Sequence, residues 1–350
     1  MEKNAKTIPF KCILEVNYGA YFNFNRLKSY RPYVHMYMLN GGRGIGKSTG
    51  VYLDWYKEYN KTKAEFVLVR RYPDEAKQSR TALDPMFSGV STMGIGVKGC
   101  FAFMNGNNRL GYCVSLSAQH KLKSGVDFSK VKYIIYDEYT ILQNATRRYI
   151  QNEPIEFFEL LSTIVRTRKD YYVYMIGNNL DRFNPYHEFF NVPQFENIWV
   201  DKERGIYCEY CKTKKELLEL EKETPLYNMI KGTAYGDYHY DNKLLTTTEG
   251  RIGEKENDAE LLCRFVYNTI TLNIYYHNGL EIFVEYKNKV IKDNITYIIY
   301  EKNFPNYFFI KRYRQSSIKN FIDACYGNSE VTYDSDGAVD VFSRLMEELK

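Results

Sequence analysis

The sequence predicts an α/β protein that begins with a parallel sheet covered by helices on both faces and continues into a smaller, strand-rich part. Three observations lead to this fold class. Short apolar runs recur in the first half of the chain, between segments of helical periodicity. A glycine cluster, NGGRGIGKSTG at residues 40–50, directly follows the first of these runs. After about residue 200 the chain becomes charged and then shows the pattern of antiparallel strands.

The expected elements of the first half follow in order along the chain. Five apolar runs of strand length are predicted strands: residues 34–39, 65–70, 112–116, 133–136 and 171–176. Two segments with helical periodicity are predicted helices, from about 48 to 59 and from about 156 to 167. Because ligands of parallel sheets bind at the carboxyl ends of the strands, functional residues should gather there.

The second half is expected to contain a connector and a separate domain. The charged stretch KTKKELLELEKET at 212–224 predicts a solvated helix, and we assign residues 206–245 to a small linker domain. The stretch from Leu262 to Tyr286 predicts three short antiparallel strands with a turn at Asn278–Gly279, and a further strand is expected at 296–300. Two helices follow, the second at 339–350. The predicted domains are therefore 1–205, 206–245 and 246–350.

Composition restricts the class of protein. A chain of 350 residues with 44% hydrophobic residues is typical of a globular protein of about two domains. No run approaches the ~20 apolar residues of a membrane span, and no apolar leader is evident, so we expect a cytoplasmic protein without a membrane partner. The net charge of +5 permits a nucleic-acid partner without requiring one.

The seven cysteines are scattered. Only Cys208 and Cys211 form a close pair, and no second pair follows at a spacing suitable for zinc. Reduced thiols are the favoured interpretation, with metal or redox chemistry as the alternative.

The glycine cluster matches the full phosphate-binding pattern G-x-x-x-x-G-K-S, with a predicted strand before it and a predicted helix after it. Glycines allow backbone N–H groups to surround phosphate oxygens, and the helix N-terminus favours negative charge. Lys47 should reach the β- and γ-phosphates, and Ser48 should bind Mg²⁺. The expected ligands are ATP and Mg²⁺. The candidate nucleotide-binding residues are Gly41, Gly42, Arg43, Gly44, Ile45, Gly46, Lys47, Ser48 and Thr49.

An acidic pair, Asp137-Glu138, follows the apolar run at 133–136. Asp137 is suited to hold the metal, and Glu138 to orient and polarise an attacking water. An exposed acidic pair at the start of a loop is the alternative. Together with the phosphate loop, the pair favours hydrolysis over binding alone.

Other nucleotide-binding classes fit less well. A GTPase should carry Asn-Lys-x-Asp after a strand, whereas Asn178-Asn179-Leu180-Asp181 lacks the lysine. A small-molecule kinase would not need Glu138, and a switch that does not hydrolyse nucleotide would tolerate its loss. Comparing the turnover of ATP with that of GTP would distinguish a GTPase from an ATPase.

Several arginines are candidates for the site. Arg166 and Arg168 lie at a predicted helix end, where an arginine can serve a neighbouring subunit's γ-phosphate or only interact with the helix dipole. From the residues alone both interpretations stay open. Arg43 can touch phosphate or face a neighbour. Arg70 and Arg71, which end the second predicted strand, can reach the site or line a pore.

Several motifs occur together in one order: GGRGIGKS, FVLVRRYPDEAKQS, IIYDE, VRTR, GNN and NPY. In this order and spacing the chain resembles the phi-29-like bacteriophage DNA-packaging ATPases. The segments GTAYG at 232–236 and RFVYNTITL at 264–272 are also similar to that family. The resemblance covers nearly the whole chain.

The resemblance implies an ASCE-type P-loop ATPase domain, a small linker domain and a C-terminal RNase H-like domain. It implies an ATP-hydrolysing ring motor, expected to be a homopentamer, at the portal vertex of a procapsid in the host cytoplasm. Such a motor translocates double-stranded DNA. Its implied partners are DNA, its own copies and the portal protein, and a structural packaging RNA is a further candidate.

The resemblance also assigns roles to residues. Lys47 and Ser48 bind nucleotide and Mg²⁺, Asp137 is the metal-side acid and Glu138 the catalytic base. Arg166 matches the trans-acting arginine finger. Asn178 matches the polar residue that couples the γ-phosphate to movement.

The C-terminal domain offers Glu281 and Glu285, but no early-strand aspartate between Arg264 and Thr271. An RNase H-type nuclease needs several carboxylates around two metals, so a non-cleaving domain is favoured. KRYRQ, with Lys311, Arg312 and Arg314, can contact phosphates or form a solvated basic turn. A helicase-type translocase and a terminase with an active nuclease remain the alternatives.

Overall fold

A computed structural model describes residues 10–13, 21–122, 126–141, 148–178, 184–193, 197–233, 235–236, 240, 250–267, 270–278, 281–291, 293, 295–298 and 308–349. The chain forms two compact units. The first comprises residues 1–186 and 196–245, and the second comprises residues 187–195 and 246–350.

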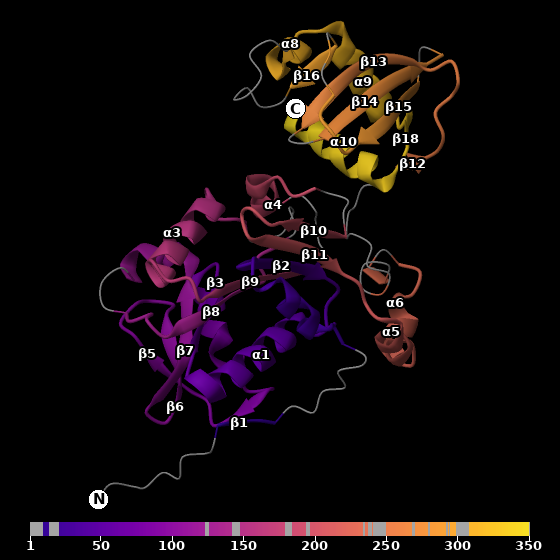
Figure 1. Cartoon of the computed structure of the whole chain (residues 1–350). Coiled ribbons are helices and arrows are strands. Elements are labelled where there is room, and N and C mark those ends of the chain that lie inside the picture. The colour runs from indigo at the N-terminus through magenta and orange to yellow at the C-terminus, as the bar shows by residue number, and fades with distance from the viewer. Residues whose placement is uncertain are drawn as a thin grey trace, which may run out of the picture. The chain divides into compact units, whose positions relative to one another are not determined.

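The first unit is built on a nine-stranded sheet in the order β10-β11-β2-β9-β8-β3-β7-β6-β5 (Figure 1). The strands from β11 to β7 run parallel, and β10, β6 and β5 are antiparallel to their neighbours. The sheet consists of β2 (Met36–Gly41), β3 (Glu65–Arg70), β5 (Ser91–Gly94), β6 (Phe101–Asn105), β7 (Asn108–Ser115), β8 (Val131–Asp137), β9 (Tyr172–Asn178), β10 (Ile198–Asp201) and β11 (Ile206–Cys211). A small separate pair joins β1 (Lys11–Cys12) to β4 (Phe87–Ser88).

Helices of different lengths complete the first unit. They are η1 (Phe24–Tyr30), α1 (Lys47–Thr62), α2 (Pro73–Gln78), η2 (Ser79–Thr81), η3 (Leu116–Leu122), α3 (Glu153–Val165), the start of α4 (Pro185–Phe190), α5 (Lys215–Lys222) and α6 (Pro225–Ile230).

Helix α1 covers one face of the parallel strands. Its buried side chains recur at helical spacing, and Trp55 packs edge-on against Phe66 of β3 with ring centroids 4.6 Å apart. The indole N–H of Trp55 donates to the carbonyl of Ala64 at 2.9 Å, which fixes the turn between α1 and β3. Burial of these aromatic side chains stabilises this layer.

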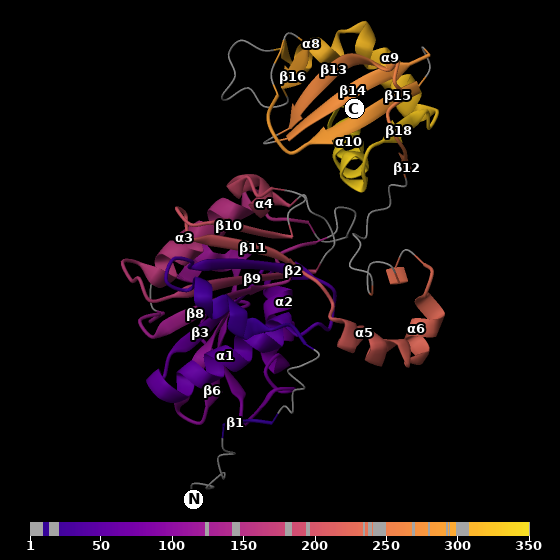
Figure 2. The same cartoon turned by 45° about the vertical axis from the view of Figure 1, so that its right-hand side comes forward.

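Helix α3 covers the opposite face. Tyr136 of β8 stacks on Phe157 of α3 with centroids 5.4 Å apart, and Tyr186 packs against both rings. Strand residues alternate between the two faces, so Ile135 belongs to the α1 layer while Tyr136 belongs to the α3 layer. The predicted parallel sheet with helices on both faces is confirmed (Figure 2).

The strand order brings distant motifs together. Strand β9 lies between β2 and β8, and the register pairs Gly41 with Asn178 and Asp137 with Ile176. Because these strands are parallel, the glycine-rich loop, the acidic pair and Asn178 all emerge at one edge of the sheet.

The expected linker differs from the observed structure. Strand β11, the first part of the predicted 206–245 linker, pairs in parallel with β2 inside the first sheet, and β10 joins its outer edge. A domain limit at residue 205 would separate β10 from β11. The structure instead keeps residues 196–245 with the first unit and places 187–195 in the second.

The second unit contains a seven-stranded sheet in the order β12-β18-β15-β14-β13-β16-β17. Its strands are β12 (Arg251–Ile252), β13 (Glu260–Tyr267), β14 (Ile270–His277), β15 (Glu281–Lys287), β16 (Thr296–Ile298), β17 (Phe308–Phe309) and β18 (Val331–Tyr333), and its helices are the end of α4 with α8 (Ile310–Arg314), α9 (Ser317–Gly327) and α10 (Asp336–Leu349). The three antiparallel strands β13, β14 and β15 confirm the predicted meander. The addition of β16 and β17 in parallel beyond β13 agrees with an RNase H-like arrangement.

Helices α8 and α10 pack on one face of this second sheet, through Tyr313 against Phe265 and Phe342 against Tyr333. On the other face Arg264 donates to Asn273, which donates to Glu285 at 2.8 Å. In the described part of the chain no three His, Cys, Asp or Glu side chains gather in a group that could hold a metal ion. Arg312 and Arg314 are exposed, whereas Gly279 and the side chain of Lys311 lie outside the described residues.

No described helix is long and apolar enough to cross a membrane. All seven cysteines are free thiols, and Cys208 and Cys211 are buried in β11.

Candidate functional site

The glycine-rich loop joins the end of β2 to the start of α1. Gly44 and Gly46 have φ angles of 75° and 89°, in the left-handed region that glycine adopts without strain. A Cβ at Gly41 would lie 2.4 Å from the carbonyl oxygen of Cys211, so glycine is needed there for the close approach of β11. Gly46 directly precedes α1, and the free N–H groups of the first helical turn therefore belong to the same loop as the glycines.

Lys47 lies within the loop with only 6% of its surface exposed. Its ammonium group donates to the carbonyls of Gly41 at 3.0 Å and Gly42 at 2.7 Å. Burial lowers the pKa of Lys47 to about 8, against the opposing influence of Cys211 and Asp137. Among the described residues this buried cation has only backbone carbonyls as hydrogen-bond partners, and it is therefore suited to receive an anionic ligand.

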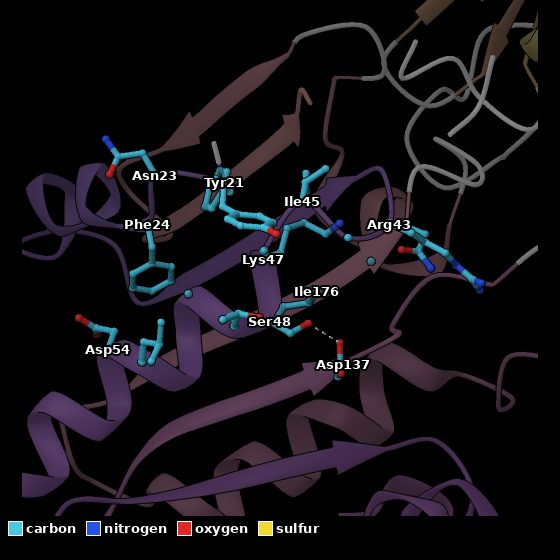
Figure 3. Close-up of a pocket in the computed structure, with 18 of the residues that line it drawn as sticks. Tyr21, Asn23, Phe24, Arg43, Ile45, Lys47, Ser48, Asp54, Asp137 and Ile176 are labelled. Carbon is cyan, nitrogen blue, oxygen red and sulfur yellow. Dashed lines mark hydrogen bonds between the residues drawn. The ribbon is translucent and has the colours of Figure 1, made fainter. Parts of the chain in front are cut away.

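Ser48 joins the loop to the acidic pair. Its hydroxyl donates to Asp137 Oδ1 at 3.2 Å across the α1–β8 boundary, as Figure 3 shows. Burial raises the pKa of Asp137, and the positive charge of Arg70 opposes that rise. A hydroxyl and a carboxylate oxygen this close together are the ligands that Mg²⁺ takes in phosphate sites.

Glu138 follows with a φ of 60°, a conformation that costs a non-glycine residue about 1–3 kcal/mol and that often marks functional positions. Its side chain is 60% exposed and accepts from Arg70 Nη1 at 3.2 Å. Arg70 Nη2 also lies 3.8 Å from Asp137 Oδ2. Of the two predicted roles for Arg70, the structure brings it to the site, where it contacts both acids.

Asn178 ends β9 between the loop and the acidic pair, and Thr140 donates to its carbonyl at 3.1 Å. Its neighbours Asn179 and Asp181 lie outside the described residues.

These residues surround a pocket of about 650 Å³. The predicted residues that line it are Arg43, Gly44, Ile45, Gly46, Lys47, Ser48, Thr49, Asp137, Glu138 and Asn178. Gly41, Gly42 and Arg166 are not among its lining residues. Arg43 lines the pocket with an exposed side chain that extends away from Ser48 (Figure 3).

A further wall of the pocket was missed by sequence reasoning. Residues 21–25 (YFNFN) line it beside Gly50, Leu53 and Lys57 of α1. A Cβ at Gly46 would lie 3.1 Å from Tyr21, and a Cβ at Gly50 would lie 3.0 Å from Phe24, so both glycines allow this segment to approach. No local motif marks the segment.

Ionic contacts fix the segment that follows. Arg31 and Lys28 pair with Asp54 of α1, and Arg26 pairs with Glu209 of β11. The wall is thus attached both to the helix after the phosphate loop and to the strand beside it.

The two arginines after α3 have different environments. Arg166 is exposed, and its side chain forms no hydrogen bond or ion pair with the described residues. Arg168 is half-buried and donates to the carbonyls of Ser129 at 3.3 Å, Ile164 at 2.9 Å and Val131. Arg166 is therefore available to another molecule, whereas Arg168 is committed to its own chain.

Arg71 points away from the pocket into the α3 layer. It forms a buried ion pair with Glu153, with Nε 2.7 Å from Oε2, and donates to the carbonyl of Tyr139 at 2.7 Å. Tyr136 donates to the same carboxylate at 2.6 Å. This network links the loop after β8 to the first turn of α3, so Arg71 has a structural role in this unit.

Comparison with known proteins adds independent findings. A sequence profile of the podovirus DNA encapsidation protein (Gp16) family matches residues 16–347. The DNA packaging protein of Bacillus phage phi29 is 26% identical over 261 residues, which cover 73% of this chain and 76% of that protein. The DNA packaging protein of Bacillus phage B103 is 26% identical over 235 residues, which cover 67% and 72%.

Among solved structures, the bacteriophage Phi-29 viral genome packaging motor assembly contains a chain with a similar fold. The TM-score is 0.61 at 20% sequence identity, over 95% of this chain and 100% of that chain. This likeness covers both units and supports the fold described above.

Proposed function

Because the chain belongs to the podovirus DNA encapsidation protein (Gp16) family, we propose that it is an ATP-hydrolysing motor that translocates double-stranded viral DNA into a procapsid. Its relatives are named DNA packaging proteins. The observation that carries the proposed chemistry is the 3.2 Å contact of Ser48 with Asp137, in one pocket with Lys47 and Glu138.

The residues present fit a magnesium-bound triphosphate. Ser48 Oγ and Asp137 would hold the ion directly or through water, and the ion would neutralise charge on the phosphate oxygens. Lys47 would exchange its two backbone carbonyl partners for phosphate oxygens. The wall at residues 21–25 would lie against the base and ribose.

Glu138 would accept a proton from the attacking water. Its carboxylate is exposed toward the pocket and follows the metal-side acid directly in the chain. Arg70 holds this carboxylate, and rearrangement of that contact sets when Glu138 is free to act. Asn178 lines the pocket between the two motifs, where its amide can sense the γ-phosphate.

A neighbouring copy of the chain completes the site. We infer that Arg166 acts in trans as an arginine finger in a homomeric ring, which we take to be a pentamer. Its exposure and its absence from the lining of its own chain's pocket support this role. The ring works in the infected host cell at the portal vertex, with the portal protein and a structural packaging RNA as further partners. DNA is held through its phosphates, which suits a motor that must move any sequence.

The first test replaces the proposed base. Purified Glu138→Gln should bind ATP with Mg²⁺ like the parent chain but lose DNA-dependent ATP turnover by at least 100-fold, as expected for loss of a general base. Glu203→Gln, an exposed glutamate in the β10–β11 turn, is the matched control and should keep normal turnover. Normal turnover by Glu138→Gln would contradict its assigned role as general base. Replacing ATP by GTP in the same assay tests whether the site distinguishes adenine from guanine.

The second test addresses the trans arrangement. Arg166→Ala and Lys47→Ala should each be inactive alone, but a mixture should recover turnover because some interfaces combine an intact loop with an intact finger. Assembly of the mixture is verified by sedimentation. No recovery in an assembled mixture would contradict the trans role of Arg166.

A further inference from the structure

A tight turn presents Arg166 directly after α3. The N–H of Arg168 donates to the carbonyl of Val165 at 2.9 Å, and Arg166 has φ 51° and ψ −116° between them. These angles are those of the first central residue of a type II′ turn, a position that favours glycine. An arginine in this conformation is strained, and strain of this kind persists only where the surroundings enforce it.

Arg168 is the last residue of this turn, and its side chain bonds to the two chain segments beside it. Its guanidinium donates to the carbonyl of Ile164 in the last turn of α3 and to the carbonyls of Ser129 and Val131 at the entry to β8. Helix-terminal carbonyls such as that of Ile164 lack partners within the helix. One planar cation therefore joins the end of α3 to the strand that carries Asp137 at its other end.

The donor geometry makes arginine specific for this position. A guanidinium presents several N–H groups in a fixed plane and can serve three carbonyls from two chain segments at once, whereas an ammonium is a point donor. No carboxylate in the described part of the chain pairs with Arg168. Its guanidinium instead interacts with backbone carbonyl dipoles, and such contacts are typical of an arginine with a structural role.

We propose that Arg168 is a positioning residue for Arg166: it holds the type II′ turn and thereby aims the finger at the neighbouring subunit's γ-phosphate. This inference rests on the trans role of Arg166 under the proposed function. Arg168 itself touches no nucleotide, because it lies outside the pocket of its own chain and its donors are occupied by carbonyls.

The experiment is a complementation series of DNA-stimulated ATP turnover. Arg168→Ala should bind ATP normally and lose turnover by a factor on the order of 100, the usual consequence of misplacing a catalytic group by about 1 Å. Arg168→Lys should lose less, since one or two of the carbonyl contacts can be kept. Lys169→Ala, an exposed neighbouring cation, should stay within about twofold of the parent.

The mixtures give the deciding result. Arg168→Ala mixed with Lys47→Ala should recover turnover, because the first supplies an intact loop and the second an intact finger. Arg168→Ala mixed with Arg166→Ala should not recover, since neither supplies a working finger. If Arg168→Ala does not fold, Arg168→Lys is used in the same mixtures. Its turnover should rise beside Lys47→Ala and should stay at its own residual level beside Arg166→Ala.

Two other results overturn the inference in distinguishable ways. Failure of Arg168→Ala to recover with Lys47→Ala, while Arg166→Ala does recover, would show that Arg168 serves its own subunit's fold or site, and the proposed function would stand. Failure of Arg166→Ala with Lys47→Ala would remove the trans finger itself, and with it the premise for Arg168.

Discussion

Replacing Arg166 by glycine should stabilise the first unit while abolishing turnover. The side chain is exposed and without partners among the described residues, so its removal alone changes stability by less than about 0.5 kcal/mol. The backbone, with φ 51° and ψ −116°, costs a non-glycine residue about 1–3 kcal/mol. Glycine avoids that cost but loses about 0.5–1 kcal/mol through the greater freedom of the unfolded chain.

The expected net gain is about 1 kcal/mol, which for a unit of this size raises Tm by about 2–4 °C. Arg166→Ala is the matched control, because it removes the same side chain but keeps the Cβ and therefore the strain. Differential scanning calorimetry should resolve the transition of the first unit, identified as the one that ATP and Mg²⁺ shift upward. Both variants should lack turnover.

The comparison between the two variants decides the matter. A Tm for Arg166→Ala equal to or above that of Arg166→Gly would show that the backbone is not strained there, and the argument that the turn is enforced by its surroundings would fail.

Three further outcomes are expected. ATP affinity should be constant below about pH 8 and fall by up to tenfold per pH unit above it, because the free Lys47 has a pKa of about 8 and phosphate binding favours its charged form; fluorescence titration with a labelled ATP measures this, and a flat profile to pH 9.5 would contradict it. Arg70→Ala should raise the pKa of Asp137 further, so that Mg²⁺-dependent ATP binding declines, as pH is lowered, from a higher pH than in the parent; an unshifted profile would exclude the contact as an electrostatic one. Glu153→Gln should destabilise the first unit by about 3–5 kcal/mol in urea unfolding, since it leaves a buried guanidinium unpaired, while the exposed pair partner Glu219→Gln should change stability by less than about 1 kcal/mol; equal effects would remove the distinction between the two pairs.

Local patterns sufficed for the parallel core of the fold. The predicted strand at 65–70 coincides with β3, and the other predicted strands differ from the observed ones mainly at their ends. Apolar runs and a glycine-rich turn are properties of adjacent residues, so one sequence is enough to show them. The phosphate loop and the acidic pair are also motifs of adjacent residues, so one sequence shows each of them. The contact between them follows from the strand order of the folded sheet.

Strand β11 shows why other parts of the fold and of the site could not be predicted from the sequence. Its sequence IYCEYC carries Glu209 at a fully enclosed position, where only 4% of the residue is exposed. The carboxylate is satisfied by Arg26 and by the hydroxyl of Tyr207 at 2.8 Å. A charged residue in a strand suggests a solvated connector until its partner, which is distant in the sequence, is known. The pocket wall at residues 21–25 was missed because no local motif marks it, and its place depends on contacts with Gly46 and Gly50, which are distant in the sequence.

The close approach of Gly41 to Cys211 lies at the end of β11, where the chain leaves the nucleotide-binding sheet. No side chain separates the end of the loop strand from the carbonyl of Cys211, so the two backbones must shift together. The polypeptide then continues through Lys212 toward α5 and the second unit. A change in the loop's conformation on ligand binding should therefore also move the end of β11. An environment-sensitive dye attached at Lys212 would report nucleotide binding without contacting the pocket.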